Sequence, residues 1–217
     1  MYFFKTPKLF EYCYPEAIWH GDRNNKRVYL TFDDGPVPIV TDYILDLLSE
    51  YGIKATFFCV GENVKYHPKI FNRLAEEGHN IGNHTYNHLN GWKVSDNEYL
   101  ENIQKCTDII RQAGYQDSLP LFRPPYGRIR RKTLKEISKT YKIIMWDVLS
   151  YDFAVRISNE TCLSKSLKHT NNGSIIIFHD SIKTYEKIKL VISQYIMSLL
   201  EENYEFCRIN EIFSSNC

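Results

Sequence analysis

Short apolar runs alternate along the chain with longer segments in which apolar residues recur at helical spacing. The short runs predict strands at 28–32, 55–60, 80–83, 121–122, 143–146, 174–178 and 205–208. The longer segments predict helices at 38–51, 68–77, 131–139, 159–169 and 185–202. A further helix is expected to run to about residue 112 from a capping box formed by Ser95 and Glu98.

The strand-like runs are apolar along nearly their whole length, which is typical of parallel strands covered by helices. About seven strand–helix units follow one another without an internal repeat, a low-complexity tract or a Gly/Ser linker. The pattern therefore predicts a single α/β domain over residues 1–217, folded as a distorted barrel of about seven parallel strands inside a layer of helices.

Composition narrows the classes of function. The chain has 217 residues, of which 43% are hydrophobic and 24% charged, as in ordinary globular domains. A formal net charge of +1 argues against a nucleic-acid or acidic-membrane partner. No apolar run is long enough to span a membrane, and residues 1–11 do not resemble a signal peptide.

Six cysteines are scattered without a Cys-x-x-Cys pair, which fits neither a zinc ribbon nor a redox motif. We expect free thiols, which suit a reducing compartment such as the cytoplasm.

Polar residues occur where the predicted strands end. In a parallel barrel these ends share one rim, where active sites are built, so residues far apart in sequence can meet in one pocket. The residues at or just past strand ends are Asp33, Asp34, His84, Arg123, Asp152 and His179.

A metal site is the first chemistry that these residues suggest. His84 and His88 are four residues apart, which places both imidazoles on one side of a helical turn. Together with Asp34 they would supply two histidines and one carboxylate and leave coordination positions open, as hydrolytic metal sites require. Alone, the aspartate pair reads equally well as an Asp-Gly turn and the histidine pair as incidental. His79 is interpreted as structural.

Two further residues suggest acid–base chemistry. Arg123 precedes two prolines and could hold a carboxylate through two parallel hydrogen bonds, although Pro-Pro segments are often inert connectors. His179 ends a buried strand, where a histidine is usually a core residue. Asp152 offers a partner that would orient it and raise its pKa, as an acid catalyst near neutral pH needs.

Five segments, taken in order, resemble the polysaccharide deacetylase family, the NodB-homology domain of carbohydrate esterase family four. They recur in the family's order across roughly residues 19–213. The segments are TFDDGP (31–36), GIKATFF (52–58), GHNIGNHTYNH (78–88), FRPPYG (122–127) and GSIIIFHD (173–180).

The resemblance implies a role for each matching position. Asp33 would be the catalytic base, oriented by Arg123, and His179 the general acid, tuned by Asp152. The metal would be held by Asp34, His84 and His88; it is most often zinc in this family, with cobalt or nickel as alternatives. The backbone N–H of Tyr126 would stabilise the oxyanion. The residues expected to contact substrate are Tyr126, Phe153, Ile177 and Phe178.

The fourth family motif, typically Asp-x-x-Asp-Trp, is imperfect in this chain. Leu149 replaces the first aspartate, and Phe153 replaces the tryptophan and lacks its indole N–H. Of the three characteristic positions of this motif, only the second aspartate, Asp152, is kept.

The implied activity is removal of N-acetyl groups from N-acetylglucosamine in peptidoglycan or chitin-like glycans. The alternatives are an O-acetyl esterase acting on xylan or a hydrolase of small amides, with the same fold and metal, and an inactive carbohydrate-binding module. The expected partner is an acetylated carbohydrate; the oligomeric state stays open. Peptidoglycan lies outside the cytoplasm, so the substrate is either an intracellular precursor or is reached by an export route that the sequence does not display.

Overall fold

The computed structural model describes residues 2–213. Its strands are β1 (Ala17–Ile18), β2 (Arg27–Asp33), β3 (Thr56–Cys59), β4 (Asn80–Asn83), β5 (Leu121–Phe122), β6 (Lys142–Ile144), β7 (Val148–Leu149), β8 (Ile175–His179) and β9 (Glu205–Phe206). Its α-helices are α1 (Lys8–Cys13), α2 (Val40–Glu50), α3 (Gly61–Tyr66), α4 (Pro68–Glu76), α5 (Asp96–Gln112), α6 (Arg131–Ile137), α7 (Asn159–His169) and α8 (Tyr185–Glu201). Two short 3₁₀ helices are η1 (Pro125–Gly127) and η2 (Ile209–Phe213).

The strands form a parallel sheet in the order β1-β6-β5-β4-β3-β2-β8-β7. The ring is bridged between its two edge strands by the N-terminal segment, in which Lys5 pairs with Val148 of β7 in antiparallel fashion. The distorted parallel barrel is therefore confirmed. Six of the predicted strands belong to this ring, while the seventh, β9, lies off it and pairs with β2. The ring is completed by β1 and β7, which have only two residues each and were not predicted.

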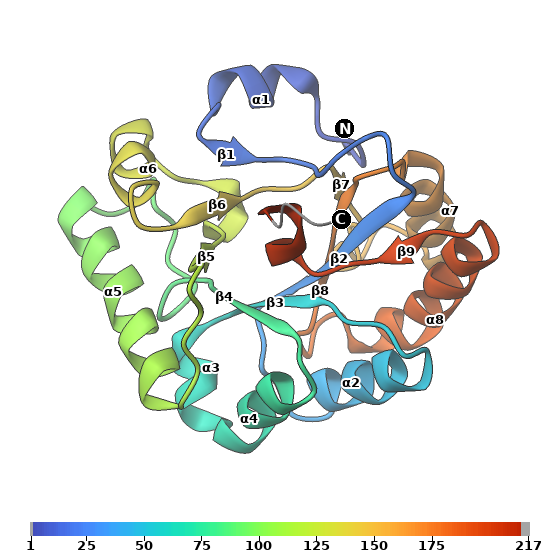
Figure 1. Ribbon diagram of the computed structural model, residues 1–217, viewed down its shortest axis with the longest axis horizontal. Helices are drawn as coiled ribbons and strands as arrows, with labels where there is room; N and C mark the ends of the chain where they lie inside the picture. The colour runs from blue at the N-terminus through green and yellow to red at the C-terminus, as the bar shows by residue number, and fades with distance from the viewer. Residues whose placement is uncertain (1, 214–217) are drawn as a thin grey trace.

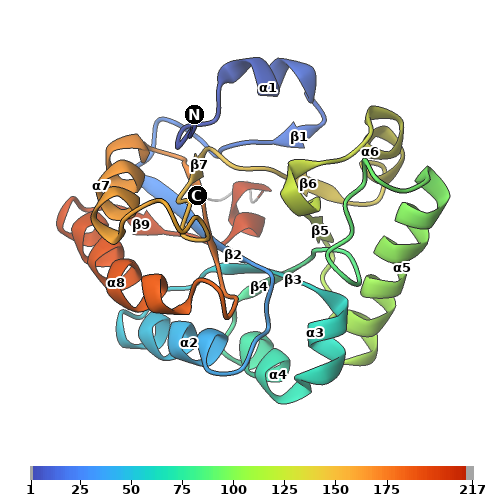
Figure 2. The same ribbon diagram turned by 180° about the vertical axis from the view of Figure 1, so that it is seen from behind.

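Helices surround the ring, and α1 lies between α6 and α7 in the outer layer (Figures 1 and 2). The outer faces of the central strands pack against α2, α4, α7 and α8 in one large apolar cluster. The buried strand residues in this cluster include Leu30, Phe32, Phe57, Ile176 and Phe178.

A second apolar layer fills the barrel interior, and the C-terminal segment crosses the middle of the ring in Figure 1. Ile209 of η2 is fully buried, and its N–H donates to Thr56 Oγ1 at 3.0 Å. Because β9 pairs with Arg27 and Val28 at the start of β2, this segment closes the N-terminal end of the barrel. The interior layer includes Tyr29, Phe58, Leu121, Ile144, Ile175 and Ile209.

Side chains alternate between the two faces of each strand, so the inward positions continue toward the C-terminal end. On β2 the inward residues Tyr29 and Thr31 lead to Asp33, and on β8 Ile175 and Ile177 lead to His179. Asp33 and His179 are register partners across the β2–β8 pair, which brings two chemically active side chains to the same level of the rim.

The predicted helices and strands are found within a few residues of their expected bounds, whereas α1, α3 and the 3₁₀ helices were not predicted. Cys13, Cys59, Cys106 and Cys162 are free thiols, as expected, and Cys217 lies outside the described residues. No helix in residues 2–213 combines the length and apolar character needed to cross a membrane.

Candidate active site

Asp33 and Arg123 form a buried ion pair at the centre of the rim. Arg123 is fully buried, and one of its Nη1 hydrogens is donated to Asp33 Oδ1 at 2.6 Å. Its guanidinium also donates to Thr31 Oγ1 and to the carbonyls of Ile144 and Met145. Burial lowers the pKa of Arg123, but an arginine stays protonated. The predicted orienting contact between Arg123 and a carboxylate is present.

Asp34 turns away from Asp33 because its backbone leaves the extended conformation, with a φ of 91°. Asn63 donates to the Asp34 carbonyl at 2.7 Å, and the next N–H, that of Gly35, donates to Asp180 Oδ1 at 2.9 Å. Gly35 leaves no room for a side chain, since an added Cβ would lie 1.9 Å from Asp180 Oδ2. A left-handed non-glycine residue held on both sides is typical of a functional site.

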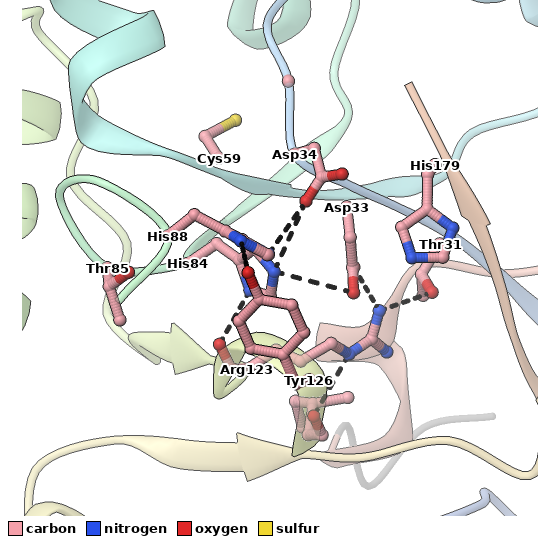
Figure 3. A network of polar contacts seen from close by, with 12 residues as sticks. Thr31, Asp33, Asp34, Cys59, His84, Thr85, His88, Arg123, Tyr126 and His179 are labelled. Carbon is pink, nitrogen blue, oxygen red and sulfur yellow. Dashed lines mark hydrogen bonds and ion pairs between the residues drawn. The ribbon is translucent and has the colours of Figure 1, made fainter. Parts of the chain in front are cut away.

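The turn brings the Asp34 carboxylate to the two histidines (Figure 3). Asp34 Oδ1 lies 3.2 Å from His88 Nε2 and 3.8 Å from His84 Nε2. One potential ligand atom from each of the three residues lies within 4.8 Å of the others. The three residues proposed from sequence therefore meet at one point.

The histidine pair reaches this point by a different route from the one predicted. Residues 84–88 are not helical; they form a loop in which Thr85 and His88 have φ values of 64° and 57°. Asn83 Oδ1 accepts the Thr85 N–H at 2.8 Å, and Thr85 Oγ1 accepts the Leu89 N–H at 2.9 Å. These side-chain contacts replace helical hydrogen bonds, so the helical-turn prediction was wrong.

The chemistry of these donors fits a divalent metal. His84 Nδ1 donates to the Arg123 carbonyl at 2.8 Å, which leaves the Nε2 lone pair facing Asp34. Burial lowers the pKa of His84 to about 4, so the ring is neutral, the form that binds metal. Buried Asp34 Oδ1 has no well-formed hydrogen bond among the described residues, although His88 Nε2 is close. Such inward-facing lone pairs repel one another unless a cation lies between them.

Asp34 is held in its charged form. Burial alone would raise the pKa of Asp34, but the contact with His88 and the proximity of His179 and His84 keep that pKa well below its ordinary value. His88 is positioned from its other side by Tyr126, whose hydroxyl lies 3.1 Å from His88 Nδ1. A ligand histidine fixed through its second nitrogen is typical of metal sites.

His179 and Asp152 form a second polar pair at the rim. His179 Nδ1 donates to Asp152 Oδ1 at 2.8 Å, and the backbone N–H of His179 donates to Asp152 Oδ2 at 2.7 Å. Ser150 and the backbone N–H of Phe153 also donate to Oδ1. Burial alone would lower the pKa of His179, but the Asp152 carboxylate raises it to about 9. The structure thus brings Asp152 to the place that the imperfect motif indicated.

The predicted substrate contacts are only partly supported by position. Phe153 is half exposed, and its ring packs edge-on against His179 at 5.0 Å between centroids. Tyr126 is 59% exposed and adopts a φ of 60° beside His88. Ile177 is buried one layer below His179. The prediction for Phe178 was wrong, because its fully buried side chain lies on the outer face of β8 against Tyr195.

Asp180 was not singled out from the sequence, although it directly follows His179. It is fully buried and accepts hydrogen bonds from Gly35 and Thr41, and burial raises its pKa to about 8. Its side chain fixes the turn that aims Asp34. The available signal was an aspartate next to a rim histidine at the end of an apolar strand. His79, in contrast, lies apart from the metal group and accepts the Ala55 N–H.

A parallel barrel whose rim carries a buried Asp–Arg pair, a candidate metal site and a His–Asp pair defines one class of protein. Residues 20–142 match the family model for polysaccharide deacetylase, and the chain belongs to that family.

Known members give the comparison more detail. A Bacillus cereus protein named peptidoglycan-N-acetylglucosamine deacetylase is 42% identical over 163 residues, which are 74% of this chain and 58% of that protein. The chain thus spans less than two thirds of that relative. The solved Bc1960 peptidoglycan N-acetylglucosamine deacetylase has a TM-score of 0.87 at 34% identity and covers 95% of this chain and 96% of its own. The wild-type Bacillus anthracis BA3943, described as a CE4 family pseudoenzyme, has a TM-score of 0.79 at 28% identity, over 91% of this chain and 69% of its own.

Proposed function

We propose that this chain is a metal-dependent hydrolase that removes the N-acetyl group from N-acetylglucosamine residues of peptidoglycan or a chitin-like glycan. The names of the similar proteins support this substrate class. Because the fold also occurs in a pseudoenzyme, family membership alone does not carry the proposal. The observation that carries it is that the Asp33–Arg123 pair lies beside the ligand set and that His179 is the register partner of Asp33.

Asp34, His84 and His88 would hold the metal, and zinc suits a set of two imidazoles and one carboxylate. A bound zinc ion would lower the pKa of water, and this supplies a nucleophile at neutral pH. It would also polarise the carbonyl oxygen of the substrate. Cobalt or nickel could be held by the same donors.

Asp33 is positioned to act as the base. Its Oδ1 is held by Arg123 at 2.6 Å, while its Oδ2 lies 3.9 Å from His84 Nε2, on the side of the ligand set. This leaves Oδ2 to take a proton from the attacking water. The contact with Arg123 fixes the direction of the carboxylate, so that little reorganisation is needed during the reaction.

His179 is positioned to act as the acid. Its Nδ1 proton is committed to Asp152, so its Nε2 proton is the one that can be passed to the leaving nitrogen. With a pKa raised to about 9, the ring is protonated at neutral pH. His179 thus carries the proton that an acid needs, while Asp33 offers a carboxylate oxygen on the side of the ligand set.

The test is acetate release by the zinc-loaded protein, measured side by side on chitooligosaccharides, peptidoglycan fragments and acetylated xylan. We expect release from the first two and its loss with a chelator. The Asp33→Asn and His179→Ala variants should lose at least about 100-fold in kcat, with circular dichroism showing that each remains folded. Release from xylan alone would replace the proposal with an O-acetyl esterase, and release from none of the three would leave a binding module.

A further inference from the structure

A groove lined by aromatic side chains begins at the candidate active site and leads to the N-terminal segment. We call it the aromatic groove; its principal side chains are Phe3, Phe10, Trp92, Tyr126, Trp146 and Leu149. Its volume is about 330 Å³, within the range of roughly 300–1,000 Å³ that is usual for small-molecule sites. No step of the proposed deacetylation uses this groove.

We propose that the aromatic groove binds the sugar residue adjacent to the one that is deacetylated. This inference rests on the proposed function, because it assigns the groove to the same substrate. It names a glycan-binding subsite built largely by the N-terminal segment.

Continuity with the candidate active site is the first argument. The Tyr126 hydroxyl contacts the ligand histidine His88 at 3.1 Å (Figure 3). The same side chain lines the groove. On the other wall, Leu149 and Tyr151 lie on either side of Ser150, which donates to Asp152. A molecule in the groove is therefore next to whatever occupies the rim, as the neighbouring unit of a polymer would be.

The chemistry of the walls is the second argument. Phe3, Phe10 and Trp92 are each about half exposed, so they present apolar faces to solvent. The Arg128 guanidinium lies over the rings of Trp92 and Tyr126, at 5.3 and 5.9 Å from their centroids. Aromatic faces with a few polar groups suit a pyranose ring, which offers C–H faces and hydroxyl edges but no charge.

Leu149, which departs from the fourth family motif, makes this wall of the groove apolar. Leu149 stands where the family motif has an aspartate, so the wall is apolar where a charge would have been. A carboxylate there would have to remain hydrated, whereas the leucine can be covered by a sugar ring at no desolvation cost.

The groove is preformed, which is the third argument. The N-terminal segment is tied to β7 by the Thr6 N–H donating to the Asp147 carbonyl and the Leu149 N–H donating to the Phe4 carbonyl. Phe4 is buried, and this anchors the segment. Trp146 packs so closely on Gly127 that an added Cβ would lie 2.6 Å from the indole ring. Aromatic walls held in place lose little conformational entropy when a ligand binds.

The test compares two residues of helix α1. Phe10 lines the groove, whereas Tyr12 lies outside it and is 80% exposed. Neither is in the core, so Phe10→Ala and Tyr12→Ala should both fold. We expect Phe10→Ala to lower kcat/KM for the N-acetylglucosamine pentamer about tenfold and to leave free N-acetylglucosamine, which has no adjacent sugar, within about twofold. Tyr12→Ala should leave both unchanged.

Equal effects of Phe10→Ala on free N-acetylglucosamine and on the pentamer, or no effect on either, would overturn the proposal. Calorimetric titration with both ligands separates this outcome from failure of the proposed function. If the wild type releases no acetate but binds the pentamer more tightly than the monosaccharide, and Phe10→Ala but not Tyr12→Ala removes the difference, the groove is supported and the activity is refuted. Equal binding of pentamer and monosaccharide by the wild type refutes the groove.

Discussion

The Asp152→Asn substitution tests whether the charge of Asp152 sets the proton occupancy of His179. In the wild type the pKa of His179 is raised from 6.5 to about 9, with Asp152 as the largest raising influence and burial as the opposing one. A shift of about 2.5 units corresponds to roughly 3 kcal/mol in favour of the protonated ring. Without the Asp152 charge, burial lowers the pKa of His179, so we expect it to drop by about 2 units or more.

The direction of the effect follows from the role of His179 as an acid, which is active only when protonated. The wild-type enzyme should lose activity as the pH rises through the pKa of His179, and Asp152→Asn should lose it at a lower pH. At pH 8 the variant should retain less than about a tenth of its activity at its own optimum. A metal ion bound by Asp34, His84 and His88 acts on His179 in both proteins, so the difference between the two alkaline limbs is the quantity to compare.

The assay is kcat/KM for acetate release between pH 5 and 10, with Asp147→Asn as a matched control. Asp147 is also buried and paired, with Lys5 at 2.6 Å and Arg23 at 2.9 Å, but it does not contact His179. Both variants should lose stability in urea, whereas only Asp152→Asn should move the alkaline limb. Coincident limbs for the wild type and Asp152→Asn, or an equal displacement in Asp147→Asn, would refute the reasoning.

Three further outcomes are expected. Arg123→Met leaves Asp33 as an unpaired buried charge, so urea unfolding should show a loss of about 3–5 kcal/mol; a loss below about 1 kcal/mol would contradict the buried pair. Tyr126→Phe removes the hydroxyl beside His88, so zinc affinity measured against a chromophoric chelator should fall about 10–100-fold; unchanged affinity would show that the contact is incidental. Ile209→Ala should cost about 2–5 kcal/mol in the same urea measurement because it empties the end of the barrel; wild-type stability would mean that the C-terminal segment does not close it.

The elements that could be predicted from sequence are those whose signals are local. Helix α5 begins where the capping box indicates, and Ser95 Oγ accepts the Glu98 N–H at 3.2 Å. The long strands β2 and β8 carry enough apolar residues to be recognised without knowledge of their neighbours. Because each of these strands ends at the rim, the rim positions of Asp33 and His179 followed from the same pattern.

The features that escaped prediction depend on contacts between distant parts of the chain. Strands β1 and β7 have two residues each and exist because neighbouring strands supply hydrogen-bond partners. The loop that carries His88 contains left-handed Thr85, a conformation that no local propensity indicates for a β-branched residue. It is maintained by the Asn83 side chain, whose amide in turn donates to Ile103 and Thr107 on α5. The sequence could identify the ligands but not the path of the backbone between them.

Phe178 was wrongly predicted to contact substrate, and its actual position shows that packing on the outer face determines the register of β8. Neighbours on a strand face opposite sides, so Phe178 and His179 cannot both line the barrel. A slip of one residue in β8 would place His179 in the apolar layer beneath α8 and withdraw Phe178 from Tyr195, and burying an unpaired polar ring costs several kcal/mol. The apolar outer face therefore selects the register that holds His179 beside Asp33. In β2 the same constraint acts through Phe32, which packs on Phe57 of β3 in the outer layer. The rim chemistry thus depends on side chains on the opposite face of the sheet, which no substrate reaches.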